Sequence, residues 1–423
     1  MAVSAALTLA SGAALPAAHP STALVPVLTV PTGEAVITAD RLYVHRTEPF
    51  TDGSGTLTAY RLPDGTASWQ RPVRAVAFTV VAGVPITVAV GAAGSAADAA
   101  IVPSRIISTA LAPETGEPLW TREGGPAGEA AGGVLYLEQA AGPTGDETRV
   151  TAVDPRSGRQ VWGAPVRGRL DWDRHRLVSL STDGVLTTYD LGTGKQLASK
   201  RTAEAPGSRR DPGRPGRPAG GERVAALGTP VLLGPRVALV DYPTGELSAY
   251  DADTLAHLWS ATMMGTHHLR RCDPLICLTT SGHIHAVDPV TGREAWPPVQ
   301  AGPSSDRLPV DLPGAGHLLL GETSLGFSSV VVEVETGRAR ELTGWIISRR
   351  DGPPRPATQA PLLFRYDRVA HTTWVGLLDR KSLEVAVLGT IGDTLPAWCS
   401  VASPYLLCHL EDRPGQMRLW RAG

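Results

Sequence analysis

The chain has 423 residues, which is enough for two or three ordinary domains or for one large array of repeats. Hydrophobic residues make up 42% of the chain and can fill a sizeable core. A formal net charge of −2 excludes the strong overall field with which proteins attract nucleic acid, so we expect no nucleic-acid partner.

Residues 1–22 resemble a signal sequence or a membrane anchor. Residues 2–15 are apolar or small, and Pro16-Ala17-Ala18 offers a cleavage site, but the basic start of a secretory signal is missing. Two explanations stay open: a start codon placed too far downstream, which would leave the leader truncated, or a disordered Ala-rich leader. We favour export, so the protein is expected to be extracytoplasmic, either secreted or associated with the outer face of the cytoplasmic membrane through this N-terminus. The stretch itself is too short and too weakly hydrophobic for a spanning helix.

From residue 57 onward the chain repeats one short pattern: an alternating apolar run, a turn and a bulky residue. Repetition of this kind decides the architecture of a chain before any catalytic motif does. The clear copies begin at Leu57, Ile107, Val150, Leu186, Leu247 and Ile284, and two weaker copies begin at Val330 and Trp374.

The copy "VTAVDPRSGRQVW", residues 150–162, shows what each part can do. Asp154 can accept hydrogen bonds from the backbone of the turn, Gly158 can adopt a left-handed conformation, and Trp162 is a large ring to bury. We assign the same turn role to Asp190, Gly194, Asp251, Asp288 and Gly292, and the same packing role to Trp69, Trp120, Trp259 and Trp296. Because the Asp recurs in copy after copy, it is predicted to serve the hairpin and not catalysis.

Most copies follow another pair of apolar strands, such as "GGVLYLEQ" before Val150, so each unit offers about four strands. An isolated four-stranded sheet cannot bury both faces, whereas sheets packed radially around an axis can. A tandem of sandwiches would not favour one hairpin per unit, and β-helix rungs are shorter. The sequence therefore predicts an all-β fold, a β-propeller of four-stranded antiparallel blades.

Residues 203–223, "AEAPGSRRDPGRPGRPAGGER", are rich in Pro, Gly and Arg. This composition is typical of a disordered insertion on the surface. Contact with an acidic partner or with lipid headgroups is the alternative to the solvated loop that we expect.

The four cysteines fall into two pairs, Cys272 with Cys277 and Cys399 with Cys408. Each pair is expected at the same place in its unit, with one cysteine at the end of the first strand and one in the second. Adjacent antiparallel strands bring such side chains within reach of a disulfide. We therefore predict two disulfides within blades, which persist in oxidising compartments, over free thiols in the core.

For the first cysteine pair, binding of a metal ion is the alternative to a disulfide. The histidines that flank it are His267, His268, His283 and His285. No Cys-x2-Cys knuckle or carboxylate–histidine pattern fixes a zinc geometry here, so we predict no metal site.

The chain ends are predicted to close the ring. Residues 397–422 look like three strands of a further unit, and residues 23–30, "ALVPVLTV", can supply its outer strand. This composite unit stands beside eight hairpin copies, so either one weak copy is not a blade or the ring has more than eight blades.

The segments "AVDPRSGRQVW", "YDLGTGKQL" and "AVDPVTGREAW" resemble the pyrroloquinoline-quinone-type (PQQ-like) repeat: a strand, an Asp, a Thr-Gly turn and a terminal Trp. The resemblance covers about residues 33–423, with four or five specific copies. It implies a propeller that commonly has eight blades, so we predict eight blades in one domain, residues 23–423. The family includes quinoprotein alcohol dehydrogenases, the propeller lipoprotein of the outer-membrane assembly machinery, and other exported bacterial propellers.

The resemblance implies two classes of function. Quinoprotein dehydrogenases carry two adjacent cysteines, a calcium-ligating set and a catalytic Asp, and this sequence has no Cys-Cys dipeptide. We predict no catalytic or cofactor-binding residues, no cofactor, and a non-enzymatic monomer that binds a protein or an envelope ligand on a propeller face. The alternatives are a PQQ-dependent oxidoreductase and an extracytoplasmic sensor domain.

Overall fold

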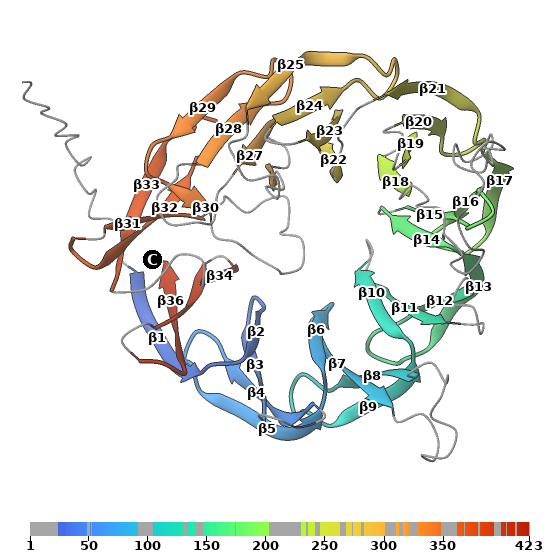
Figure 1. Ribbon diagram of the computed structural model, residues 1–423. Helices are drawn as coiled ribbons and strands as arrows, with labels where there is room; N and C mark the ends of the chain where they lie inside the picture. The colour runs from blue at the N-terminus through green and yellow to red at the C-terminus, as the bar shows by residue number, and fades with distance from the viewer. Residues whose placement is uncertain are drawn as a thin grey trace, which may run out of the picture.

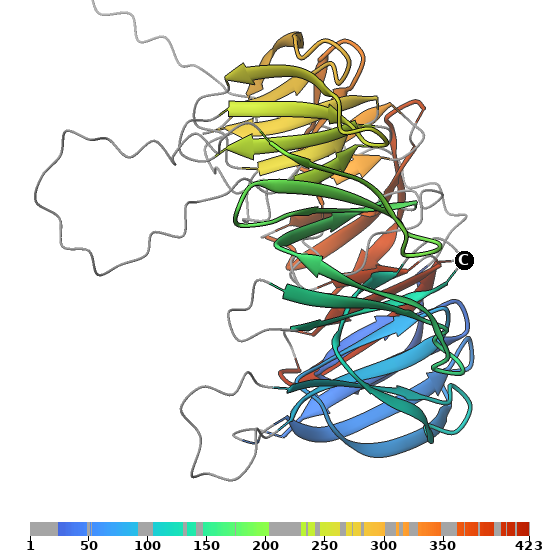
Figure 2. The ribbon, with the colours of Figure 1, turned by 90° about the vertical axis from the view of Figure 1, so that its right-hand side faces the viewer.

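The described strands form a ring of antiparallel sheets (Figure 1), which Figure 2 shows edge-on. The computed structural model describes residues 24–48, 51, 53–91, 105–129, 133–140, 147–173, 175–202, 230–233, 236–241, 246–262, 268–272, 274–280, 283–300, 310–312, 316–320, 329–347, 362–367, 369–379, 381–392, 399–402, 404–410 and 413–422. The leader, residues 1–22, and the insertion, residues 203–223, lie outside them. Within the described ranges no helix has the length and hydropathy that crossing a membrane requires.

Four sheets, each of four consecutive strands, make up the first half of the ring, with the first strand of each nearest its centre (Figure 1). They are β2 (Glu34–Ile37), β3 (Arg41–Thr47), β4 (Ser54–Arg61) and β5 (Ala67–Arg74); β6 (Ala77–Val81), β7 (Val84–Gly91), β8 (Arg105–Leu111) and β9 (Pro118–Glu123); β10 (Gly125–Glu129), β11 (Leu135–Ala140), β12 (Glu147–Val153) and β13 (Gln160–Arg167); and β14 (Arg169–Trp172), β15 (Arg176–Leu180), β16 (Val185–Asp190) and β17 (Gln196–Arg201).

Four more sheets with the same strand order follow. They are β18 (Pro230–Leu233), β19 (Arg236–Asp241), β20 (Glu246–Asp251) and β21 (His257–Thr262); β22 (His268–Cys272), β23 (Leu275–Thr280), β24 (His283–Val287) and β25 (Glu294–Gln300); β26 (Val310–Leu312), β27 (His317–Leu320), β28 (Ser329–Glu333) and β29 (Ala339–Leu342); and β30 (Ile346–Ile347), β31 (Leu362–Asp367), β32 (Thr372–Leu378) and β33 (Val385–Ile391).

The two chain ends share the last sheet, as the sequence predicted. The strands β34 (Cys399–Ala402), β35 (Tyr405–His409) and β36 (Gln416–Ala422) are completed by β1 (Leu24–Pro31), which pairs antiparallel with β36 from Leu24 opposite Ala422 to Pro31 opposite Gln416. We call this sheet the closing sheet. Its outermost strand comes from the N-terminus, so hydrogen bonds between the two chain ends close the ring.

The predicted number of eight blades is wrong, because the described strands form nine four-stranded sheets. All eight hairpin copies, the two weak ones included, contribute the outer pair of strands to a sheet of their own. The closing sheet adds a ninth, and it has no hairpin between its two outer strands because they lie at opposite ends of the chain. A count of hairpins therefore misses it.

The core lies between neighbouring sheets and follows from the two-residue period of a strand. On β3, Tyr43 packs with Phe78 in the cluster toward the β6–β9 sheet, whereas Leu42 and Val44 pack with Leu419 in the cluster toward the closing sheet. Each sheet thus buries both faces, which the radial arrangement allows.

Candidate functional site

The recurring Asp residues lie at the turns of their own hairpins. Asp154 Oδ1 accepts the backbone N–H of Arg156 at 3.1 Å and of Ser157 at 2.7 Å, and the Ser157 hydroxyl at 2.8 Å. These bonds, above all the one from the Ser157 backbone, lower the pKa of the Asp154 carboxyl. The carboxylate is engaged by its own turn.

The other predicted Asp residues have the same arrangement in later sheets. Their Oδ1 atoms accept the backbone N–H three residues further on, from Thr193 to Asp190 at 2.8 Å, from Thr254 to Asp251 at 2.9 Å and from Thr291 to Asp288 at 2.8 Å. Because the four turns belong to four successive sheets, the structure does not bring these carboxylates together.

Each of the predicted Trp residues connects its own sheet to the next one. Trp120 is an example: its Nε1 donates to Pro155 O in the turn of the following sheet at 2.9 Å. The further indole bonds of this kind run from Trp69 to Pro113 O, Trp162 to Leu191 O, Trp259 to Pro289 O and Trp296 to Val334 O, at 2.7–2.9 Å. We call a junction of this type a Trp–Gly seam, because the same ring lies against the turn glycine of the next sheet.

The turn glycines are required for two reasons, of which the sequence predicted one. Gly158, Gly194 and Gly292 have φ of 66°, 70° and 70°, a conformation that side chains disfavour. In addition, a Cβ on Gly158 would lie 2.5 Å from Trp120 Cγ, so the ring of the preceding sheet occupies the space of a side chain.

The four cysteines form the two predicted disulfides, Cys272–Cys277 and Cys399–Cys408. Each joins the two innermost strands of one sheet. The positions within the sheets differ from the prediction, however. Cys272 ends β22 and faces Leu275 in the register, whereas Cys399 begins β34 and lies directly opposite Cys408. The sequence separation of the two cysteines is 9 in the second pair and 5 in the first, because Cys399 and Cys408 lie at the open end of their hairpin.

One of the histidines near the first disulfide contacts a carboxylate. His285 Nδ1 lies 2.7 Å from Glu294 Oε1 on the neighbouring strand. His267 lies outside the described residues. Among the residues that the structure describes, no group of three or more His, Cys, Asp or Glu side chains is placed to hold a metal ion.

Two adjoining hollows lie at the junction of the β2–β5 sheet and the closing sheet, and we call them together the closure hollow. One has a volume of about 310 Å³ and the other about 390 Å³. The first is lined by Pro31, Val44, Arg46, Thr47, Glu48, Thr56, Thr58, Tyr60 and Gln70, and the second by Thr29, Val30, Pro31, Thr32, Arg46, Gly415 and Gln416. Arg46 and Pro31 belong to both.

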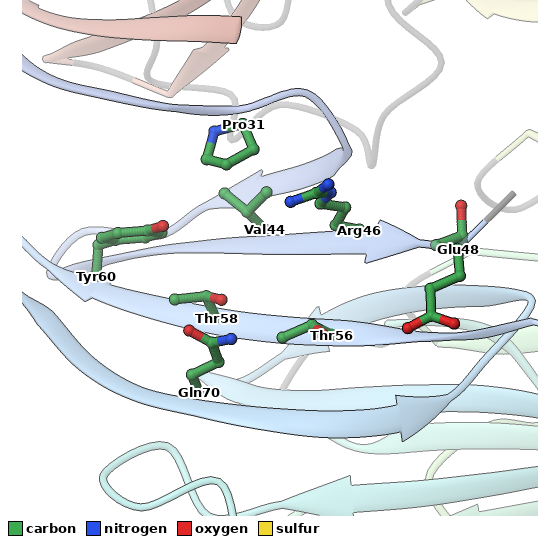
Figure 3. A pocket seen from close by; sticks show the side chains of 9 residues that line it. Pro31, Val44, Arg46, Glu48, Thr56, Thr58, Tyr60 and Gln70 are labelled. Carbon is green, nitrogen blue, oxygen red and sulfur yellow. The ribbon is translucent and has the colours of Figure 1, made fainter. Parts of the chain in front are cut away.

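Figure 3 shows how the strands place these side chains. Arg46 lies on β3 with its guanidinium toward Pro31 of β1, and Thr56, Thr58 and Tyr60 follow one another along β4. Arg46 has no ion-pair partner among the described residues. Burial raises the pKa of Tyr60, and a hydrogen bond with the Thr58 side chain opposes part of that rise.

Sequence reasoning missed the closure hollow. The alternation of Thr56, Thr58 and Tyr60 was visible, but so was the same alternation in other copies. What makes the place distinct is Arg46, on a strand face that elsewhere packs inward, and β1, which arrives from the other end of the chain. Only the ring closure brings them together.

A second feature lies on the outer strands of four consecutive sheets. Leu119 on β9, Val161 on β13, Leu197 on β17 and Leu258 on β21 are 44%, 45%, 43% and 38% exposed. Each stands at the same place, directly before the Trp or, in β17, before Ala198. Figure 1 shows these strands one after another along the rim, each at the outside of its sheet. We call the four residues the outer apolar row.

Comparison with known proteins gives a family and several structural neighbours. The family model described as "Outer membrane protein assembly factor BamB" matches residues 104–215 and 146–315. Similar solved structures include BamB from Moraxella catarrhalis (16% identity, 94% of this chain and 97% of that chain, TM-score 0.44), the computationally designed Ika8 protein (11%, 95% and 100%, 0.45) and a europium-containing methanol dehydrogenase (11%, 84% and 84%, 0.45). None of the curated proteins matches the chain.

The family matches carry the assignment. They overlap, and together they span residues 104–315, half of the chain, where most of the clear repeat copies lie. The chain therefore belongs to the family of PQQ-like repeat propellers that is described by the outer membrane protein assembly factor BamB.

Proposed function

We propose that the protein is a non-enzymatic propeller of the cell envelope that binds a partner protein along its outer strands. The observation that carries this proposal is the outer apolar row: Leu119, Val161, Leu197 and Leu258 expose 38–45% of their surface at one repeated position. Single exposed apolar residues are ordinary, but a series of them on consecutive elements offers a partner several anchors at once.

The strands that carry the row add a second means of attachment. β9, β13, β17 and β21 each end their sheet, and no strand among the described residues pairs with their outer edges. Open edges present unpaired backbone groups with which an extended segment of another chain can pair. We therefore expect a partner segment that supplies apolar side chains and, at one of the sheets, a strand.

Two further observations support a location in the envelope. The disulfides Cys272–Cys277 and Cys399–Cys408 are of the kind that persists outside the reducing cytoplasm. The family is described by an assembly factor for outer-membrane proteins, which acts on other proteins. By analogy, this chain is proposed to be exported and to take part in an envelope assembly of proteins.

Photo-crosslinking in the source cells tests the partner surface. A photoreactive residue at Leu119 or Leu197 is expected to crosslink to one envelope protein, and the same residue at Arg156, an exposed turn position, is not. Leu119→Glu together with Leu197→Glu should abolish co-purification of that protein, while Thr121→Glu, exposed on the same strand as Leu119, should leave it intact. Equal crosslinking at all three positions would contradict the proposal.

The alternative of a quinone-dependent oxidoreductase needs its own measurement. The purified protein is mixed with pyrroloquinoline quinone and calcium, and the absorbance of the quinone is followed together with electron transfer from primary alcohols to a dye. We expect no binding and no reduction. A calcium-dependent complex that reduces the dye would replace the scaffold proposal.

A further inference from the structure

The closure hollow differs from every Trp–Gly seam in the way its walls are built. At those seams a Trp ring fills the outer part of the junction. At the closing junction the outer strand is β1, and Leu28 is the side chain that approaches the turn glycine Gly65. The hollow extends along β3 and β4 from Tyr60, near this turn, to Arg46, Glu48 and Thr56 at the other end of the two strands.

The hollow has the size and the wall chemistry of a site for a small polar ligand. Its two parts, about 310 and 390 Å³, fall at the lower end of the range of roughly 300–1,000 Å³ that is usual for small-molecule sites. Hydroxyl groups of Thr56, Thr58 and Tyr60 form one wall, and the Gln70 amide stands beside them (Figure 3). Hydroxyl and amide groups both donate and accept hydrogen bonds, which complements a ligand that is itself rich in hydroxyls.

Charge limits the ligand further. Arg46 contributes a guanidinium to both parts of the hollow and has no ion-pair partner among the described residues, so it is available for a carboxylate. Glu48 lines the first part further along β3 and would repel a second negative group. A ligand with one negative charge fits this pair better than a nucleotide or another polyphosphate does.

We propose that the closure hollow binds a sugar acid, with its carboxylate on Arg46 and its hydroxyls on Thr58, Tyr60 and Gln70. The ligand is either a free sugar acid or an acidic sugar within a glycan of the cell envelope, which share this chemistry. The site lies at the junction with the closing sheet, whereas the outer apolar row lies on β9, β13, β17 and β21. Ligand binding therefore does not depend on the proposed protein partner.

Calorimetric titration of the full-length protein tests the proposal with glucuronate, glucose and acetate as probes, and with a short oligosaccharide of glucuronate. Glucuronate is expected to bind at one site, and glucose and acetate at least tenfold more weakly, because each lacks half of the recognised groups. Tighter binding of the oligosaccharide assigns the site to a glycan, and tighter binding of the monomer assigns it to the free acid.

Three variants locate the site. Arg46→Gln should weaken glucuronate binding about ten- to hundredfold, as expected for the loss of a charged hydrogen bond, and should leave the weak glucose binding unchanged. Thr58→Val, which keeps the shape but loses the hydroxyl, should weaken binding about three- to tenfold. Arg105→Gln, an exposed arginine on β8, is the matched control.

The proposal is overturned by any of three results: no glucuronate binding to the wild-type protein, equal affinity for acetate and glucuronate, or an Arg46→Gln affinity equal to that of Arg105→Gln. Circular dichroism of each variant shows whether it is folded. Because Arg46 is exposed, its replacement is expected to leave the fold intact.

Discussion

The Trp–Gly seams and the seam between the β14–β17 and β18–β21 sheets solve the same packing problem in opposite ways. At a Trp–Gly seam the earlier sheet supplies the large group and the later sheet supplies a glycine, as with Trp162 and Gly194. One seam on, the Trp position is occupied by Ala198, and the glycine position of the next sheet is occupied by Leu255. The large side chain has moved to the other side of the junction.

We call this junction an inverted seam, and its two residues, Ala198 and Leu255, meet in one cluster. Leu255 is fully buried, and Ala198 packs against the cluster that contains it. Leu255 has a φ of 53°, which costs a side chain about 1–2 kcal/mol. Burying a leucine contributes about 1.5–3 kcal/mol, so the exchange is favourable only where no Trp already fills the space.

A second seam has a similar exchange. In the sequence Glu341 stands four positions after the turn glycine, where the clear copies have Trp, although the strand register places Arg340 opposite Val331, the counterpart of Ala152. The following sheet carries Leu383 at the glycine position, with a φ of 57°. Leu383 packs against the cluster that contains Leu342 of the earlier sheet. At both places the repeat Trp is absent and a leucine stands at the glycine position, and at the second place Trp345 also packs against the cluster. Different side chains therefore fill the junction at different seams.

Removing a Trp should have the largest effect. Trp162→Ala leaves a cavity beside Gly194 and removes the bond to Leu191 O, so we expect the free energy of unfolding to fall by about 3–5 kcal/mol. Urea denaturation followed by circular dichroism measures the change. Val369→Ala, at a residue that is 93% exposed, is the control and should change it by less than about 0.5 kcal/mol.

The same experiment can be extended to imitate the inverted seam. Adding Gly194→Leu to Trp162→Ala should recover about 1–2 kcal/mol, because leucine refills part of the space. In the wild-type background Gly194→Leu should destabilise, because its Cβ would collide with the Trp162 ring. If Gly194→Leu recovers no stability in the Trp162→Ala background, the two residues do not share one space.

A methyl group on a seam glycine should have the next largest effect. Gly158→Ala combines a φ of 66° with a Cβ placed 2.5 Å from Trp120, and we expect a loss of about 2–4 kcal/mol. Gly83 is the matched control: its φ is 78°, but nothing lies within 4 Å of an added Cβ. Gly83→Ala should cost only the conformational part, about 1–2 kcal/mol. Equal losses in the two variants would exclude the Trp contact as a cause.

Converting the inverted seam to the Trp–Gly type is the third test. Ala198→Trp alone should lose about 1–3 kcal/mol, because the ring meets the buried Leu255. Ala198→Trp with Leu255→Gly should lose less than either single change, and the double-mutant cycle gives the coupling energy. Additive losses would show that Ala198 and Leu255 are independent.

Much of the fold could be predicted from the sequence because it depends on local patterns. The alternation of Val150 to Val153, the Asp and Gly of each turn and the spacing of the copies identify hairpins and a propeller. The disulfides followed from cysteines on adjacent strands. The number of sheets could not be counted in the same way, because the closing sheet has no hairpin between β36 and β1.

The seams and the closure hollow escaped prediction because their residues meet only in three dimensions. Trp120 and Gly158 are 38 positions apart in the sequence, and each already had a sufficient local reason to be present. Arg46 reads as one charge in a solvent-facing strand until β1 is placed beside it. The substitution pair Ala198 and Leu255 is a signal of the seam in the sequence, but interpreting it requires knowledge of which residues face each other.

The smallest expected effect concerns the turn Asp, which both kinds of seam retain, as Asp251 before Leu255 and Asp288 before Gly292 show. The backbone N–H of Thr291 above all, with that of Val290 and the Thr291 hydroxyl, lowers the pKa of Asp288 below its ordinary value of 3.8. The ionised carboxylate therefore stabilises the folded state fully at pH values above the pKa that Asp288 has in the unfolded chain. This contribution is lost as the pH falls through the lowered pKa of the folded state.

Asp288→Asn should accordingly lower the free energy of unfolding at pH 7 by at most about 1 kcal/mol, because the carboxylate is exposed and screened by solvent. The difference between wild type and variant should shrink as the pH is lowered from 5 toward 2, which urea titrations across that range measure. Parallel stability curves for the two proteins would mean that the charge of Asp288 contributes nothing. The turn would then be held by geometry alone, and the seams would differ only in which sheet supplies the large side chain.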